Sequence, residues 1–244
     1  MTAPHPPLPP YYQTEAGRSR WVRRIFDQTA GDYNRVERVL GLGTGSWYRR
    51  RALRRAGLAP GMKVLDIGTG TGLVAREAAI IVGDGTLVVG VDPSPGMVEH
   101  AKVPAGVRLL AGSAEAIPAA DGSADFLSMG YALRHVSDLA RVFAEYYRVL
   151  RPGGRVCLLE VTRPERAIAR VLLRAYLRGL MPAIAAVVSR HRDMPQLMRY
   201  NWDTIAACVP PAAITDALRA AGFVEVDRFV ELGIFSEYRA RRPT

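Results

Sequence analysis

A glycine-rich stretch, 64–72, constrains the fold of this chain more than any other segment. A short apolar run enters Asp66 and is followed by a loop in which glycines alternate with other residues. These glycines are Gly68, Gly70 and Gly72. The pattern indicates a strand, a tight turn and a helix, because glycine takes positive φ freely and lets a ligand lie against bare backbone. A second apolar run, 86–91, delivers Asp92 at its end; an acid at this point of an open α/β sheet typically holds a ribose diol, so we expect a crevice for an adenosine-containing cofactor.

The spacing of these glycines resembles the first motif of class I S-adenosylmethionine-dependent methyltransferases. The dinucleotide fingerprint is G-x-G-x-x-G, with a helix N-terminus aimed at a pyrophosphate. Here the glycines read G-x-G-x-G, and Asp66 stands two residues before the first of them. S-adenosylmethionine carries an ammonium and a sulfonium but no phosphate, so an acid at the strand end suits it. A glycine loop taken alone would also fit an ordinary strand-to-helix turn.

Composition limits the class of protein. The chain has 244 residues, of which 49% are hydrophobic and 23% charged, as in one α/β domain of ordinary globular make-up. Its two cysteines have no metal-ligand spacing, so we expect no metal and a cytoplasmic, reducing location. The net charge of +10 comes almost entirely from arginine. With no recognisable nucleic-acid module, a solvated basic surface or contact with an anionic membrane surface is favoured over a nucleic-acid partner.

The chain divides into a tail and one domain. Residues 1–17 are proline-rich and are expected to be disordered. The single domain, 18–244, begins with two arginine-rich helices over 18–57 and carries a helical lid or substrate insertion over 163–210. The longest apolar run of that lid, 179–188, is interrupted by a proline and is too short to span a membrane.

Strands and helices alternate through the core, which predicts parallel βαβ units. The expected strands are 63–67, 86–91, 107–111, 124–129 and 154–162, and the expected helices are 72–82, 94–102, 137–149, 163–191 and 211–221. Residues 223–241 alternate like a hairpin, an antiparallel edge often added to a parallel sheet. The predicted fold class is α/β: a Rossmann-like, doubly wound, mostly parallel seven-stranded sheet with an antiparallel C-terminal edge hairpin, N-terminal helices and a helical lid.

Four further segments resemble the ubiquinone/menaquinone biosynthesis C-methyltransferase family, and the likeness covers nearly all of 26–240. They are Phe26-Asp27 with Tyr33 and Trp47, Gly112 to Pro118, Tyr131-Ala132-Leu133-Arg134-His135-Val136, and Leu150 to Arg155 with Leu159-Glu160. The third is similar to the family's F-G-L-R-N-V segment and is the most specific of them.

The resemblance implies S-adenosylmethionine as cofactor, with S-adenosylhomocysteine as product. The cofactor site it implies consists of Asp66, Gly68, Thr69, Gly70, Gly72, Asp92, Pro93, Met97, Ser113, Ala114 and Met129. The leading function is C-methylation of a quinol or related phenolic ring. Methylation of a soluble natural product or metabolite at carbon, oxygen or nitrogen is the alternative, followed by a non-catalytic protein that binds the cofactor.

Methylation of a quinol ring carbon requires loss of a phenolic proton, and so a base acting directly or through water. By resemblance, the candidates for catalysis are Arg134, His135, Tyr33 and Glu160. Each of three also has a structural interpretation: His135 as helix-terminal packing or a surface imidazole, Arg134 as one half of an ion pair, and Glu160 as a pin for the lid helix.

The chain departs from the family where the acceptor is expected. Asn34 and Glu37 replace the Asp and the Asn of the family's Y-D-x-M-N, His135 replaces an Asn, and Met198 replaces a tyrosine near the lid. These changes leave methyl transfer in place and put the quinone acceptor in doubt.

The segment 163–191 carries arginines at intervals of four, at positions 166, 170, 174 and 178, beside several leucines. This spacing stacks them near one helix face. The face is either a solvated one on an ordinary lid or part of a peripheral helix that meets a lipid-tailed aromatic substrate at the inner face of the membrane. The sequence leaves the oligomeric state open, a homodimer included.

Overall fold

The structure, a computed structural model, describes residues 3–244; residues 1 and 2 of the expected tail lie outside that range. The strands are β1 (Val64–Ile67), β2 (Val88–Asp92), β3 (Arg108–Ala111), β4 (Ala124–Gly130), β5 (Leu150–Val161), β6 (Val224–Glu231) and β7 (Phe235–Arg241). They form one sheet in the order β3-β2-β1-β4-β5-β7-β6. The first five strands are parallel, and β7 pairs antiparallel with both β5 and β6. The predicted fold class is confirmed.

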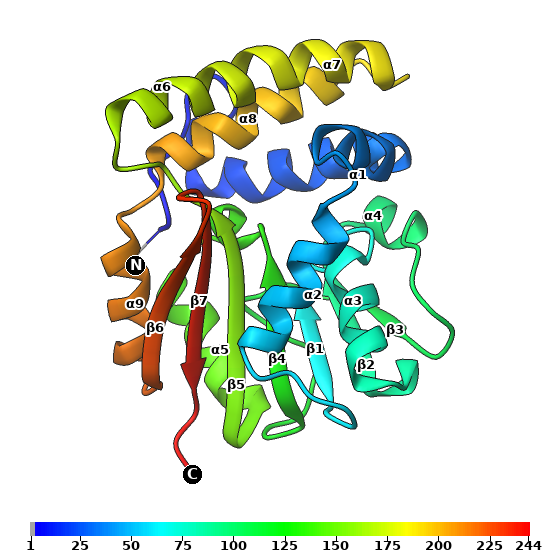
Figure 1. Cartoon of the computed structure of the whole chain (residues 1–244), viewed down its shortest axis with the longest axis vertical. Coiled ribbons are helices and arrows are strands. Elements are labelled where there is room, and N and C mark those ends of the chain that lie inside the picture. The colour runs from blue at the N-terminus through cyan, green and yellow to red at the C-terminus, as the bar shows by residue number, and fades with distance from the viewer. Residues whose placement is uncertain (1–2) are drawn as a thin grey trace.

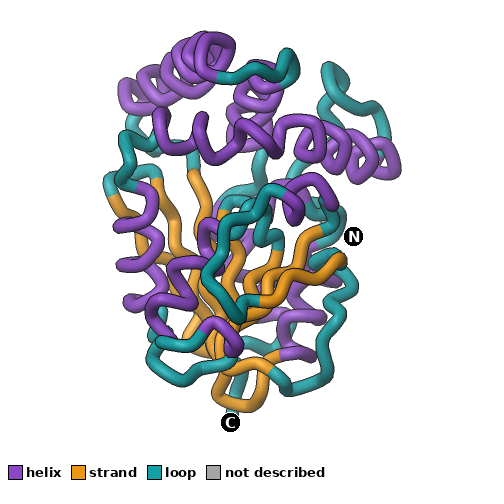
Figure 2. The backbone as a smooth tube through the Cα atoms, turned by 90° about the vertical axis from the view of Figure 1, so that its right-hand side faces the viewer, coloured by secondary structure: helices purple, strands orange, loops and turns teal. Residues whose placement is uncertain are grey.

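Helices cover both faces of this sheet, and a further helical layer caps one end of it (Figures 1 and 2). The helices are α1 (Glu15–Leu40), α2 (Gly45–Arg55), α3 (Leu73–Val82), α4 (Pro95–Glu99), α5 (Leu139–Val149), α6 (Ala167–Arg174), α7 (Met181–Val188), α8 (Met194–Ala207) and α9 (Pro211–Ala220). A π-helical turn, Ala175–Leu180, joins α6 to α7, and a short 3-10 turn, Leu133–His135, follows β4.

The central strands are apolar because both of their faces are covered. All four residues of β1 are buried, and so are four of the five in β2. One apolar cluster packs α5 and α9 against one face, around Phe143, Tyr146 and Leu218. A second packs α2 and α3 against the other face, around Leu53 and Ala78.

The strand order reverses between β1 and β4, since β2 pairs with one edge of β1 and β4 with the other. In open α/β sheets, ligands bind outside the carboxyl ends of the strands at such a switch point. The helical layer formed by α1, α6, α7 and α8 lies over that end of the sheet (Figure 1). The fold therefore encloses a site between the strand ends and the lid.

The lid contains one long helix in which α6, the π turn and α7 run without a break from Ala167 to Val188. Pro182 does not end this helix, in agreement with the single helix expected over 163–191. A proline ring normally clashes with the carbonyl one turn earlier, and the wider π turn that precedes Pro182 relieves that contact. The 22-residue helix is long and apolar enough to cross a membrane by length and composition, and only 17% of its most apolar window is buried.

Residues 3–14, expected to be disordered, form a strap against the lid. His5 and Tyr12 are 1% and 5% exposed. The strap is held by Arg18, whose guanidinium donates to the His5 carbonyl, and by the Val209 N–H, which donates to the Pro4 carbonyl at 2.8 Å. His5 Nε2 also lies 2.9 Å from the Arg134 carbonyl oxygen. The sequence did not indicate this strap because Arg134 and Val209 lie far from it along the chain.

Candidate active site

The loop between β1 and α3 is left-handed at all three glycines, with φ of +64° at Gly68, +55° at Gly70 and +81° at Gly72. A Cβ at Gly68 would lie 2.7 Å from the Cβ of Ala132, and one at Gly72 would lie 2.3 Å from Cγ1 of Val103. A Cβ at Gly70 would meet no atom within 4 Å. Two of the glycines therefore allow close packing, and the third leaves bare backbone beside open space.

Asp92 ends β2 directly beside this loop. One carboxylate oxygen accepts a hydrogen bond from the Gly70 N–H at 2.7 Å, and the other accepts from the Ser94 N–H at 2.8 Å. Burial raises the pKa of this carboxyl above its usual value. Each oxygen keeps a lone pair beyond the bond it already accepts, so the two oxygens can still take the two hydroxyls of a ribose.

Asp66 lies behind the loop. Its oxygens accept from Thr69 Oγ1 and Ser128 Oγ, both at 2.7 Å, and the residue is fully buried. Burial raises the pKa of Asp66 to about 6 in spite of these two hydrogen bonds. Asp66 therefore supports the loop from within the sheet, through its hydrogen bonds to Thr69 and Ser128.

A cavity of about 320 Å³ opens beside the loop, within the range of about 300–1,000 Å³ that is typical of small-molecule sites. Its lining includes most of the expected cofactor residues: Gly68, Thr69, Gly70, Asp92, Pro93, Met97, Ser113, Ala114 and Met129. Asp66 and Gly72 are not part of the lining. A diol-accepting carboxylate, bare glycine backbone and apolar walls within one cavity fit an adenosine cofactor without phosphate.

The same cavity continues between aromatic side chains, among them Phe26, Tyr33 and Tyr131. His135 also lines it, with its ring 5.3 Å from Phe26 edge to face and stacked 5.4 Å from Tyr200. Burial, reinforced by the positive charge of Arg134, lowers the pKa of His135 well below its usual value. His135 is thus a neutral imidazole near pH 7. Burial raises the pKa of Tyr33, which therefore keeps its phenolic proton.

Arg134 and Glu160 lie outside the cavity and form a buried ion pair. Arg134 Nε donates to Glu160 Oε2 at 2.7 Å, and the Leu133 N–H donates to the other carboxylate oxygen at 2.9 Å. Arg134 Nη1 donates to Thr204 Oγ1 of α8 at 2.8 Å and to the Asn201 carbonyl at 3.1 Å. The pair connects the end of β5, the turn after β4 and the lid.

Of the four departures from the family pattern, only His135 lines the cavity. Asn34 Oδ1 accepts a 2.5 Å hydrogen bond from a threonine hydroxyl of the glycine loop. Glu37 accepts from Arg49 Nη2 at 2.6 Å, and Met198 is buried in the core between α8 and α1. Because α1 crosses above the glycine loop, two of the positions expected to meet the acceptor lie on the cofactor side.

Arg49 and Tyr131 line the cavity, and neither of them was given a role in the site from the sequence. Arg49 belongs to a run of three arginines in an arginine-rich helix, and nothing in the sequence separates it from its neighbours. Tyr131 has φ of +61°, a left-handed conformation that costs about 1–3 kcal/mol for a residue other than glycine and is concentrated at functional sites. The Arg49 guanidinium carbon lies 5.8 Å from the centre of the Tyr131 ring.

Three comparisons with known proteins agree on the family and the fold of this chain. A sequence model described as the ubiE/COQ5 methyltransferase family matches residues 13–238. A demethylmenaquinone methyltransferase of Lactococcus lactis is 31% identical over 84% of this chain and 83% of its own length, and one of Parafrankia sp. is 34% identical over 91% and 94%. An S-adenosylmethionine-dependent methyltransferase of Thermotoga maritima shares the fold with a TM-score of 0.62, at 23% identity over 90% of this chain and 98% of that one.

Proposed function

The chain belongs to the ubiE/COQ5 methyltransferase family and is an S-adenosylmethionine-dependent methyltransferase, and we propose that it methylates a ring carbon of a quinol. The acceptor gains the methyl group at that carbon and loses the hydrogen of the same carbon as a proton. The cofactor supplies a methyl group on a positively charged sulfur, whose departure as a neutral thioether leaves S-adenosylhomocysteine.

The continuous cavity is the observation that carries this proposal. Its cofactor portion lies at the glycine loop and Asp92, and its other portion is walled by Phe26, Tyr33 and Tyr131. Aromatic walls suit a flat ring and hold it at one angle to a neighbouring group. Much of the rate enhancement in such a transfer comes from alignment of the two reactants, which a closed aromatic slot provides.

His135 is the best-placed group to take the phenolic proton of the acceptor. Its Nδ1 lies 3.3 Å from the Tyr200 hydroxyl, which lies 3.3 Å from the Tyr12 hydroxyl. When Tyr200 donates to Tyr12, the Tyr200 oxygen accepts from Nδ1–H of His135, and the Nε2 lone pair is left as the base. Burial keeps the imidazole neutral, so its Nε2 lone pair is free to accept a proton, and the same lowered pKa makes it a weaker base than a free imidazole.

The test is transfer of label from S-adenosylmethionine to a chemically reduced, short-chain demethylated quinol. Label recovered on the ring carbon supports the proposal. Cofactor binding by calorimetry without any label in the quinol would contradict it and favour a soluble aromatic acceptor. That second function is favoured by His135, since it is the one departure from the family that lines the cavity.

His135→Asn restores the residue of the family segment and separates two mechanisms. If His135 is the base, this variant lowers kcat by roughly 100- to 10,000-fold and leaves affinity for S-adenosylhomocysteine unchanged. Unchanged kcat would show that water or another group removes the proton. Tyr200→Phe is the companion variant, since it removes the hydrogen-bond partner of Nδ1 and keeps the stacked ring.

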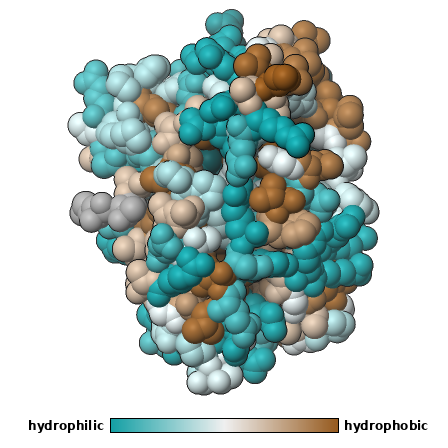
Figure 3. All heavy atoms as spheres, turned by 60° about the vertical axis from the view of Figure 1, so that its left-hand side comes forward, coloured by the Kyte–Doolittle hydropathy of each residue, from teal (hydrophilic) through white to brown (hydrophobic). Residues whose placement is uncertain are grey.

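The long lid helix concerns the place in the cell where the enzyme binds its acceptor. On this proposal the acceptor carries an apolar tail, and the enzyme works in the cytoplasm, peripheral at the inner face of the membrane, through the segment 163–191. Ile168, Leu172 and Val187 of that helix are 78%, 65% and 86% exposed. Apolar side chains gather at the upper end of the molecule beside hydrophilic ones (Figure 3).

A further inference from the structure

Arg49 is a buried cation whose hydrogen bonding is incomplete. The residue is 5% exposed, and Glu37 takes one of its N–H groups at 2.6 Å. Its Nε is buried and has no hydrogen-bond partner among the described residues. Buried charged groups are normally paired and fully hydrogen-bonded, and Arg49 is one of the residues that line the cavity. Its incomplete hydrogen bonding therefore indicates an anion that binds in the cavity.

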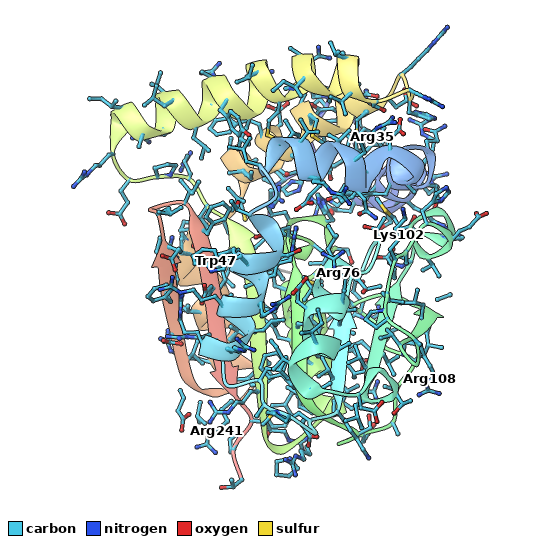
Figure 4. The ribbon with its side chains drawn as sticks, turned by 45° about the vertical axis from the view of Figure 1, so that its right-hand side comes forward. Arg35, Trp47, Arg76, Lys102, Arg108 and Arg241 are labelled. Carbon is cyan, nitrogen blue, oxygen red and sulfur yellow. The ribbon has the colours of Figure 1, made fainter. Side chains whose placement is uncertain are left out.

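The position of Arg49 is tightly determined. Figure 4 shows Arg76 of α3 reaching toward α2, where its Nη2 donates to Ser46 Oγ at 2.7 Å. A Cβ on Gly45, in the first turn of α2, would come within 2.6 Å of both Arg49 Nη1 and Glu37 Oε1. The ring of Tyr131 lies on a third side of the guanidinium. The first turn of α2 is thereby fixed to α3, and Arg49 is presented to the cavity beside the glycine loop.

The carboxylates of the cavity lining are Asp92 and Glu115, and its guanidinium groups are Arg23 and Arg49. Asp92 and Arg49 both line the cavity, and both are buried. The other arginine of the lining, Arg23, has a side chain that is 58% exposed and lies 3.9 Å from Asp27. Arg49 is therefore the buried guanidinium among the described lining residues. A carboxylate matches a guanidinium in charge and planar geometry.

We propose that Arg49 binds the α-carboxylate of S-adenosylmethionine, the single anionic group of that cofactor. Glu37 and Tyr131 hold the guanidinium in place for it. The assignment rests on the cofactor and not on the identity of the acceptor, so the quinol proposal and this one can fail separately. It also explains why Glu37 and Asn34, two residues that depart from the family, lie on the cofactor side of the cavity.

The test compares two ligands that differ only in that carboxylate, S-adenosylmethionine and decarboxylated S-adenosylmethionine, by calorimetry on the full chain without acceptor. We expect the wild-type chain to bind the first about 10- to 100-fold more tightly, the effect of one hydrogen bond to a charged group. In Arg49→Gln this ratio falls close to one, mainly through weaker binding of the carboxylate form. Such a change in the ratio isolates the pairwise interaction.

Three variants make the result decisive. Arg50 lies on the same helix as Arg49, but its Nε donates to Glu77 Oε2 of α3 at 2.9 Å. Arg50→Gln should therefore keep the wild-type ratio. Arg49→Gln combined with Glu37→Gln avoids an unpaired acid if the single variant does not fold. Asp92→Asn should weaken the binding of both ligands by the same factor. A ratio that stays at the wild-type value in a folded Arg49→Gln or in the double variant would overturn the assignment.

Discussion

At the scale of single residues, two buried histidines give the fold a dependence on pH. Burial lowers the pKa of both His5 and His135 from 6.5, and nearby arginines, Arg18 for both, act in the same direction. The folded protein therefore binds fewer protons than the unfolded chain once the pH falls below about 6.5. The free energy of unfolding then decreases by up to about 1.4 kcal/mol per pH unit for each histidine.

Urea unfolding at pH 7.5 and 6.0 measures this effect. His5→Asn and His135→Asn should each lose less stability over that interval than the wild-type protein, and His100→Asn, an exposed residue at the end of α4, should match the wild type. The interval ends at pH 6 because Asp66, with a pKa raised to about 6, acts in the opposite sense below it: its folded form takes up a proton first. Identical losses in all four proteins would contradict the prediction.

The position of a single residue was predictable where its neighbours in the sequence determine that position. Asp92 ends an apolar strand, so its position beside the glycine loop could be predicted from the sequence. Asp66 follows the same rule for position, yet its side chain points to Thr69 and Ser128. Which way a strand-end side chain turns depends on β4, a strand far along the chain. The importance of Arg49 likewise depends on contacts from α1 and α3.

At the scale of elements, the Arg134–Glu160 pair joins three segments. Arg134→Met would leave Glu160 buried without its cation, and removal of one partner of a buried pair costs about 3–5 kcal/mol. Arg134→Met with Glu160→Gln should recover part of this loss, because glutamine keeps an acceptor for the Leu133 N–H without a charge. Affinity for S-adenosylhomocysteine should stay unchanged, since neither residue lines the cavity.

Denaturant unfolding and calorimetry on the same samples check this prediction. Arg219→Met serves as the control, because Arg219 and Asp216 are 54% and 71% exposed, and pairs of that kind contribute only about 0–1 kcal/mol. Lost cofactor binding in Arg134→Met at full stability would contradict a positioning role and return Arg134 to the site.

Helices and strands were predictable where the hydrophobic pattern of the segment itself determines its structure. The five parallel strands lie within a few residues of their predicted bounds. Four of them are largely buried, and a strand buried on both faces is an apolar run whatever it packs against. The fifth, β3, lies at the edge of the sheet and has no buried residue. The helix α8 was not recognised as a separate element, and β5 begins at Leu150, before the predicted start of this strand at residue 154. Both depend on partners elsewhere: α8 packs on α7, and the start of β5 pairs with β4.

At the scale of the whole molecule, the helix Ala167–Val188 presents an exposed apolar face that does not pack in the core. Ile168, Val171 and Leu172 are each at least 65% exposed. Among the described residues, no carboxylate lies within ion-pair distance of Arg166, Arg170 or Arg174 on the same helix. A symmetric dimer through this face would set these arginines against their own copies, since an isologous interface pairs one patch with itself. An anionic bilayer matches both the apolar face and the charge.

We therefore expect the full chain to float with vesicles that contain anionic phospholipid and to stay free of neutral phosphatidylcholine vesicles. Each arginine near the membrane surface contributes about 1 kcal/mol to binding, so Arg166→Gln with Arg170→Gln and Arg174→Gln should abolish flotation, and added salt should weaken it in the wild type.

Ile168→Ser with Leu172→Ser should also abolish flotation, without a change in charge. Leu42→Ser with Leu232→Ser is the matched control, as both leucines are at least 80% exposed and neither belongs to the helix Ala167–Val188. Equal flotation of all variants would contradict the role of this helix, and a concentration-dependent dimer that the serine pair disrupts would assign the face to a second copy of the chain.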